Sequence, residues 1–100
     1  MTEVTLRRDG RRYEVAASGH ATGSPEACAA VSVLIFTLDA FMQNAPVFVI
    51  EERLEPGDAL LQFSGDKEAE DAFDMITLGF LMLQERFPDI VEVSLLESEL

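Results

Sequence analysis

The sequence has few of the residues that disulfide-stabilised, zinc-binding and nucleic-acid-binding proteins require. Its 100 residues include one cysteine and one histidine. The chain therefore forms no internal disulfide and cannot build a zinc site of the usual Cys/His type by itself. Seven basic residues stand against 19 acidic ones. Because phosphate backbones bind clustered lysine and arginine, we expect no nucleic acid among the partners.

The charge that is present is unevenly distributed. The formal net charge is -12, yet four of the seven basic residues are arginines within the first twelve positions. Residues 13–100 hold the other three basic residues and seventeen acidic ones, a net of -14. An acidic surface attracts positively charged partners, so we expect a basic protein or peptide to bind.

Features of membrane and secreted proteins are also scarce. No unbroken apolar run approaches the roughly 20 residues that a membrane span needs. The first residues, Met1-Thr2-Glu3, lack the basic-then-apolar order of a signal peptide. A lone cysteine suits a reducing compartment. We therefore expect a cytoplasmic protein with no membrane partner.

The composition is that of an ordinary globular protein despite the strong acidity. Hydrophobic residues make up 48% of the chain and charged residues 26%, both close to the averages for folded domains. A chain of this length has room for one hydrophobic core. We expect residues 1–100 to form a single domain.

Two segments of alternating polarity, residues 2–8 and 11–18, predict an N-terminal β-hairpin. They flank Asp9 and Gly10, a pair typical of a two-residue turn with positive φ at both positions. The register that follows pairs Arg8 with Arg11, Leu6 with Tyr13, and Val4 with Val15. The apolar side chains then share one face of the hairpin.

Two helices and three strands follow the hairpin. Ser24, Pro25 and Glu26 are typical of a helix start, since serine caps, proline is tolerated at the first position and glutamate favours the positive helix end. The expected elements are a helix to about Gln43, strands at 46–54 and 59–64, a helix from 66 or 67 to 87, and a strand at 90–96, followed by a frayed tail at 97–100. Pro56 and Gly57 predict a type II turn between the two middle strands.

This ββαββαβ order predicts an α+β fold of two layers, with a small mixed sheet and two apolar helices. The first helix is apolar nearly all the way round, and only Ser32, Thr37 and Asp39 interrupt its long central stretch. One small sheet covers only one face of each helix, and large apolar patches usually mark interfaces. We therefore predict a homodimer that packs through its helices.

The sole cysteine and the sole histidine are the candidate catalytic residues. Cys28 lies in the first turn of the predicted helix, where unpaired N–H groups and the helix dipole stabilise a thiolate. His20 lies eight residues earlier, in a loop bounded by Gly19 and Gly23 that is long enough to bring the imidazole to the sulfur. A thiol beside a general base is the minimum set for nucleophilic acyl transfer. Helix-start N–H groups would also suit an oxyanion.

Simpler roles for these residues stay open from residue chemistry alone. A cysteine among alanines is often a small packing residue, and a histidine after Ser-Gly is often a solvated loop residue. A redox-sensing thiol needs a resolving partner that one chain lacks. Ser32, one turn after Cys28, would line the same cleft. The acidic residues between 66 and 74 are typical of a solvated helix start, so we expect no metal and no cofactor.

The segments SGHA at residues 18–21 and CAAVS at residues 28–32 resemble the ribosomal-processing cysteine proteases, the Prp family. The resemblance covers the whole chain in its order of elements. It implies a cytoplasmic, homodimeric cysteine endopeptidase that removes the N-terminal extension of a large-subunit ribosomal protein. It also implies a catalytic dyad of His20 and Cys28, supported by Gly19, Gly23 and Ser32.

Two features differ from the pattern of that family. Its members have a longer loop between histidine and cysteine, and an aspartate three residues before the cysteine, where this chain has Pro25. Glu26 lies one residue closer to the cysteine. These differences leave a second interpretation, a weak or inactive homologue that acts as an acidic dimeric module and binds a basic ribosomal protein.

Overall fold

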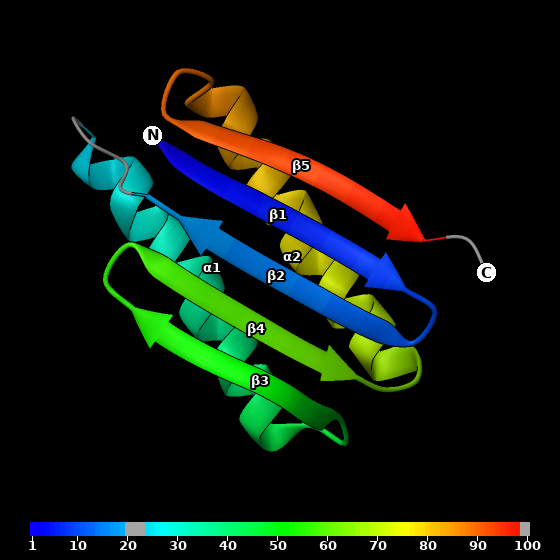
Figure 1. Ribbon diagram of the computed structural model, residues 1–100. Helices are drawn as coiled ribbons and strands as arrows, with labels where there is room; N and C mark the ends of the chain where they lie inside the picture. Colours follow the sequence, from blue (N-terminus) through cyan, green and yellow to red (C-terminus); the bar gives the residue numbers. More distant parts are fainter. Residues whose placement is uncertain (20–23, 99–100) are drawn as a thin grey trace.

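The computed structural model describes residues 1–19 and 24–98, which form a five-stranded sheet with two helices (Figure 1). In chain order the elements are β1 Thr2–Asp9, β2 Arg12–Ser18, α1 Pro25–Asn44, β3 Phe48–Glu55, β4 Asp58–Ser64, α2 Lys67–Arg86 and β5 Val91–Ser98. The predicted α+β fold with ββαββαβ order is confirmed, and every element begins and ends within two residues of its expected bounds.

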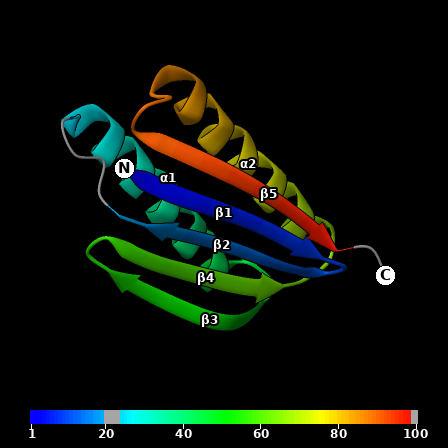
Figure 2. The ribbon, with the colours of Figure 1, turned by 45° about the horizontal axis from the view of Figure 1, so that its top comes forward.

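The sheet is mixed and is covered on one face only. Its strands lie in the order β3-β4-β2-β1-β5. The pairs β1–β2, β2–β4 and β3–β4 are antiparallel, whereas β1 and β5 are parallel. Both helices lie against the same face, with α1 over β3 and β4 and α2 over β5 and β2 (Figure 2). Neither helix lies against the opposite face of the sheet, and no other described element does.

The N-terminal hairpin has a different register from the one expected. Asp9 pairs with Arg12, so Gly10 and Arg11 form the turn. Gly10 has a φ of 62°, whereas Arg11 has no positive φ, which fits a type II′ turn because that turn needs positive φ only at its first central residue. The observed pairs are Arg8 with Tyr13, Leu6 with Val15, and Val4 with Ala17. The shift is two residues along the strand, so each side chain keeps its expected face.

The C-terminal tail also differs from expectation. Residues 97 and 98 belong to β5 and lie beside Arg8 and Asp9 of β1. The expectation of a frayed tail is therefore wrong for residues 97 and 98, whereas residues 99 and 100 lie outside the described residues. The reason is that β1 offers a full-length parallel partner, which no local sequence pattern indicates.

The core fills the space between the sheet and the two helices. Leu61 and Phe63 of β4 point into it, as the two-residue period of a strand requires. Leu38 of α1 and Phe80 of α2 meet them from the other layer, and all four side chains are at most 1% exposed. Tyr13 stacks on Phe63 with ring centroids 5.5 Å apart. This packing holds both helices on the sheet.

Helix α1 carries more apolar surface than the sheet covers. Its only charged residues are Glu26 and Asp39. By length and composition alone it is apolar enough to cross a membrane, although the sequence contains no long unbroken apolar run. Val33 and Phe36 are 60% and 59% exposed on its outer side.

Removing a buried leucine from β4 should destabilise the chain far more than removing an exposed one from β5. Leu61 is fully buried and Leu95 is 55% exposed. We expect Leu61→Ala to lower the free energy of unfolding by about 2–5 kcal/mol, and Leu95→Ala by about 1 kcal/mol or less. Urea unfolding at one fixed protein concentration measures both. Equal losses in the two variants would contradict the observed core.

Candidate active site

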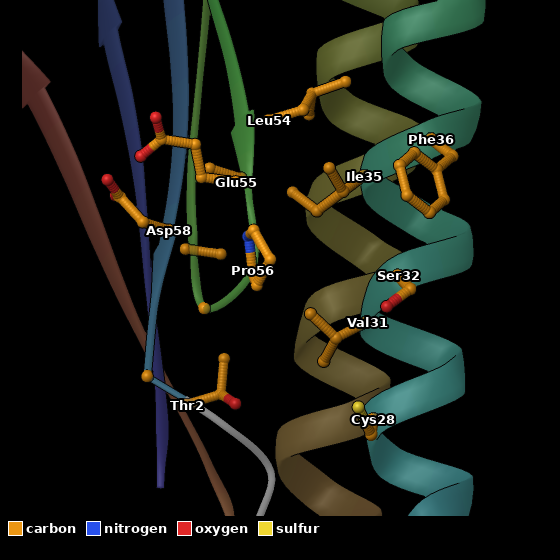
Figure 3. A pocket seen from close by; sticks show the side chains of 14 residues that line it. Thr2, Cys28, Val31, Ser32, Ile35, Phe36, Leu54, Glu55, Pro56 and Asp58 are labelled. Carbon is orange, nitrogen blue, oxygen red and sulfur yellow. The ribbon is translucent and has the colours of Figure 1, made fainter.

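A cleft of about 310 Å³ lies between α1 and the turn that joins β3 to β4 (Figure 3). The wall on α1 is formed by Cys28, Val31, Ser32, Ile35 and Phe36. The opposite wall is formed by residues 54–59, with Pro56 at the turn facing the helix. Thr2, Ala17 and Gly19 contribute from the sheet side. The cleft is therefore built from four segments that are distant in sequence.

The helix wall follows from the α-helical period. Positions 28, 31, 32, 35 and 36 recur at the spacing of one helix face. Cys28 lies at one end of this row and Phe36 at the other (Figure 3). Eight residues at 1.5 Å each separate them by about 12 Å along the helix axis. The predicted placement of Ser32 in the same cleft as Cys28 agrees with this lining.

The start of α1 is capped as the sequence predicts. The backbone N–H of Ala27 donates to the Ser24 hydroxyl at 3.1 Å, and that hydroxyl lies 3.4 Å from a carboxylate oxygen of Glu26. Pro25 occupies the first helical position. Cys28 is therefore the fourth residue of the helix, and its thiol is exposed at the cleft.

The cap uses most of the donors that we expected to serve an oxyanion. Pro25 has no N–H, and the N–H groups of Ala27 and Cys28 both donate to Ser24. Of these first four helical residues, Glu26 alone has an N–H that the cap does not use. An oxyanion at this helix start would therefore have one backbone donor rather than several.

Gly19 joins the end of β2 to the turn across the cleft. Its N–H donates to the Gly57 carbonyl at 2.9 Å, and its φ of 85° is in the left-handed region. A Cβ at this position would lie 2.3 Å from the carbonyl oxygen of Met1. Both the backbone angle and the close approach require glycine at this position, and its role in supporting the site stays a prediction.

His20 and Gly23 lie outside the described residues, so the predicted pairing of His20 with Cys28 stays a prediction. The neighbours of that segment, Gly19 and Ser24, are both described. Gly19 lines the same cleft as Cys28, and Ser24 caps the helix that carries Cys28. The chain therefore enters and leaves the undescribed segment at the Cys28 end of the cleft.

No local sequence signal identifies the wall opposite Cys28. Pro56 and Gly57 indicated a turn, and the φ of 70° at Gly57 agrees with the expected type II geometry. Nothing local shows that this turn faces α1, because its position depends on the pairing of β2 with β4. Asp58 at the same turn is held by Arg53 through two contacts of 3.1 Å. Glu55 contributes an acidic side chain to the rim.

Further along the same side of α1, Asp39 lies beside Glu52 of β3 and forms an acidic pair with it. A hydrogen bond with the Asp39 carboxyl, which Glu52 forms only while protonated, raises the pKa of Glu52 above 4.5. Burial and the charge of Asp39 act in the same direction, and the hydrogen bond from Gln43 acts against them. The Asp39 Oδ1 atom is buried and has no donor among the described residues. Within residues 1–19 and 24–98 no three metal-ligating side chains gather.

The fold and the cleft together define the class of protein: an α+β domain in which two helices cover one face of a mixed five-stranded sheet, with an exposed cysteine near the start of one helix. No protein-family model and no curated protein matches the sequence. Solved structures do match. Two structures of the essential ribosomal processing protease Prp from S. aureus superimpose with TM-scores of 0.81 and 0.79.

One of these Prp structures is in complex with a covalently linked product peptide and the other with a substrate peptide. They are 14% and 16% identical to this chain, and each match covers 95% of this chain and 99% of the other. SMU.848 from Streptococcus mutans matches with 24% identity and a TM-score of 0.76, over 98% of this chain and 96% of its own. The expected resemblance to the Prp fold is confirmed over nearly the whole chain.

Replacing Gly19 with alanine should lower the free energy of unfolding more than the same replacement at Gly10, which also has positive φ but lies in open space. A Cβ added at Gly10, which also has positive φ, would have no heavy atom within 4 Å, whereas one added at Gly19 meets the Met1 carbonyl. We expect Gly10→Ala to cost roughly 1–2 kcal/mol from the backbone angle alone, and Gly19→Ala to cost clearly more. Chemical unfolding of both variants measures the difference. Equal costs would show that the close approach is unimportant.

Neutralising Glu52 should stabilise the chain at neutral pH. Its raised pKa means that the folded chain holds the proton more tightly than the unfolded chain, so stability is gained as pH falls through that pKa. At neutral pH the charged form of Glu52 is disfavoured by its position beside Asp39. We expect Glu52→Gln to raise the melting temperature at pH 7 and to lose that advantage below pH 4.5.

Glu51→Gln is the matched control, because Glu51 lies 3.8 Å from Arg53 and loses an attraction instead. Thermal unfolding at both pH values compares the two variants. A gain of equal size in the control would show that the effect comes from net charge rather than from Asp39.

Proposed function

We propose that residues 1–100 form one cysteine endopeptidase domain of the Prp type, with Cys28 as nucleophile and His20 as general base. The observation that carries the proposal is the exposed Cys28 thiol at the end of a peptide-sized cleft. Two structures with the same fold hold peptides. Neither a metal nor an organic cofactor is needed for this chemistry.

The reaction divides into two acyl-transfer steps. His20 accepts the thiol proton as the Cys28 sulfur attacks the scissile carbonyl carbon, and a tetrahedral intermediate forms. The intermediate collapses when the C–N bond breaks and the imidazolium gives its proton to the leaving amine. Water, deprotonated by His20, then attacks the thioester carbonyl and releases the carboxylate product and the thiol.

The proposed substrate is the basic N-terminal extension of a large-subunit ribosomal protein precursor. A net charge of -12 favours a basic chain, and Glu55 places a carboxylate on the rim of the cleft. Val31, Ile35 and Phe36 make the middle and far end of the helix wall apolar. This wall suits an apolar side chain near the scissile bond, and the acidic surroundings suit basic residues beyond it. A cytoplasmic location agrees with both the substrate and the free thiol.

We further propose that the active form is a homodimer packed through α1 and α2. Exposed apolar side chains form one outer face across both helices: Val33, Phe36, Met75, Leu78 and Met82. Two 20-residue helices are each about 30 Å long and about 10 Å wide, so that side by side they span about 30 by 20 Å. Their joint outer face is therefore about 600 Å², close to the roughly 800 Å² that each partner buries in a stable complex.

The second candidate function is a non-catalytic module that binds a basic ribosomal protein. Two observations favour it. Pro25 occupies the position of the aspartate in the Prp family pattern, and the cap leaves one backbone donor at the helix start. The acidic charge would serve this function equally well.

Cleavage of the ribosomal protein precursor from the same organism, followed by mass spectrometry, tests the enzyme. We expect one new N-terminus with the wild-type chain and a loss of rate by several orders of magnitude with Cys28→Ala, because the nucleophile is removed. Ser94→Ala, an exposed serine on β5 outside the cleft, is the control and should cleave normally.

Binding of the intact precursor without cleavage would replace the enzyme with the binding module. Cleavage that persists in Cys28→Ala would contradict the assignment of the nucleophile. If the precursor is neither bound nor cut, the proposed substrate is wrong.

A further inference from the structure

Phe36 belongs to two surfaces at once. It lines the apolar end of the cleft, together with Ile35 and Leu54, and yet 59% of its surface is exposed. Along α1, Phe36 lies one turn after Ser32, which belongs to the row of residues that lines the cleft. It also lies three residues after Val33, which belongs to the exposed outer face of the helix. A helix turns about 100° per residue, so position 36 is the border between these two rows. Figure 3 shows its ring on the outer side of the cleft.

The side chain of an exposed phenylalanine has no single fixed position, so it forms a poorly ordered wall for the cleft. A side chain with more than half its surface in water keeps much of its rotamer freedom, and burial removes that freedom. Packing of another molecule on the outer side would hold the ring in one position. The far end of the cleft is then complete only when the outer helix face is covered.

We propose that a second copy of this chain completes the cleft, by covering the outer side of Phe36 and holding its ring as the wall of the apolar end. This inference rests on the proposed helix-packed dimer and adds that the dimer shapes the site. Phe36 is thus a positioning residue for the substrate, not a catalytic one.

The charge of the molecule favours a second copy as the occupant. With a net charge of -12, two copies repel each other across most surfaces. The outer row of α1, with Ala29, Val33, Phe36 and Ala40, carries no charge. Because a two-fold dimer places the same patch on both partners, an uncharged apolar face can pair with itself. The joint outer face of α1 and α2, estimated above at about 600 Å², approaches the roughly 800 Å² that one partner contributes to a stable dimer.

The test uses the Cys28 thiol as a reporter of the cleft and needs no peptide substrate. Two reagents are compared, iodoacetamide and N-(4-phenylbutyl)iodoacetamide, whose phenyl tail spans the roughly 12 Å to Phe36. The measured quantity is the ratio of their alkylation rates, since a common change in thiol reactivity cancels in it. A complete apolar wall should favour the phenyl reagent by about tenfold.

Leu78→Glu is the variant that separates the copies. Leu78 lies on the outer side of α2, is 63% exposed and does not line the cleft. We expect it to sediment as a monomer and to lose about tenfold in the rate ratio. Leu96→Glu adds the same charge at a residue 44% exposed on the face of the sheet opposite the helices, and should stay dimeric with an unchanged ratio. Circular dichroism confirms that both variants are folded.

A monomeric Leu78→Glu with the wild-type ratio would overturn the inference, and so would a wild-type chain that sediments as a monomer at about 100 μM. Wild-type chain that stays monomeric and cosediments with phosphatidylcholine vesicles would assign the face to lipid instead. The alkylation ratio and the sedimentation results do not depend on whether the chain cleaves a peptide. A precursor that is never cut would refute the enzyme, while a rate ratio that follows dimerisation would still support the completed cleft.

Discussion

The antiparallel pairing of β2 with β4 is the interaction on which the candidate site depends. It places Ala17 beside Ala59 and Ser18 beside Asp58, and the Gly19 N–H extends the ladder to the Gly57 carbonyl at 2.9 Å. The turn between β3 and β4 is thereby fixed next to the end of β2, from which the chain passes toward α1. This backbone hydrogen bond continues the ladder by one further residue and holds the turn against the end of β2. Without this pairing, the exposed thiol would face solvent rather than a wall.

Helix α1 serves three surfaces with one sequence, and this explains its unusual composition. One row, which includes Ala27, Ile35 and Leu38, is buried against the sheet. A second row lines the cleft from Cys28 onward. The third, with Val33 and neighbours, is apolar and exposed. A surface helix has one apolar stripe and one polar face. Here the polar face is almost absent, because the proposed substrate and the proposed second copy each take part of it.

The local features of the site were predictable from sequence because they depend on neighbouring residues. Ser24 caps α1, Pro25 opens it, and Cys28 follows in the first turn, all as expected. The same local reasoning put the hairpin turn one residue too early, since Asp9 and Gly10 match a common turn type while the strands pair around Gly10 and Arg11. Alternation of polarity survives a two-residue shift. The alternating pattern therefore predicted correctly which side chains are buried, but the predicted strand register was wrong.

The sequence by itself determined the order of elements, the capped start of α1 and the position of Cys28 in its first turn, because these follow from hydrogen bonds and side-chain periods within a few residues. Tertiary structure alone decided what faces that cysteine. The wall at residues 54–59, the contact of Gly19 with Met1 and the meeting of Asp39 with Glu52 all join distant segments. Such contacts depend on strand order and helix packing, which are set by burying the whole core at once.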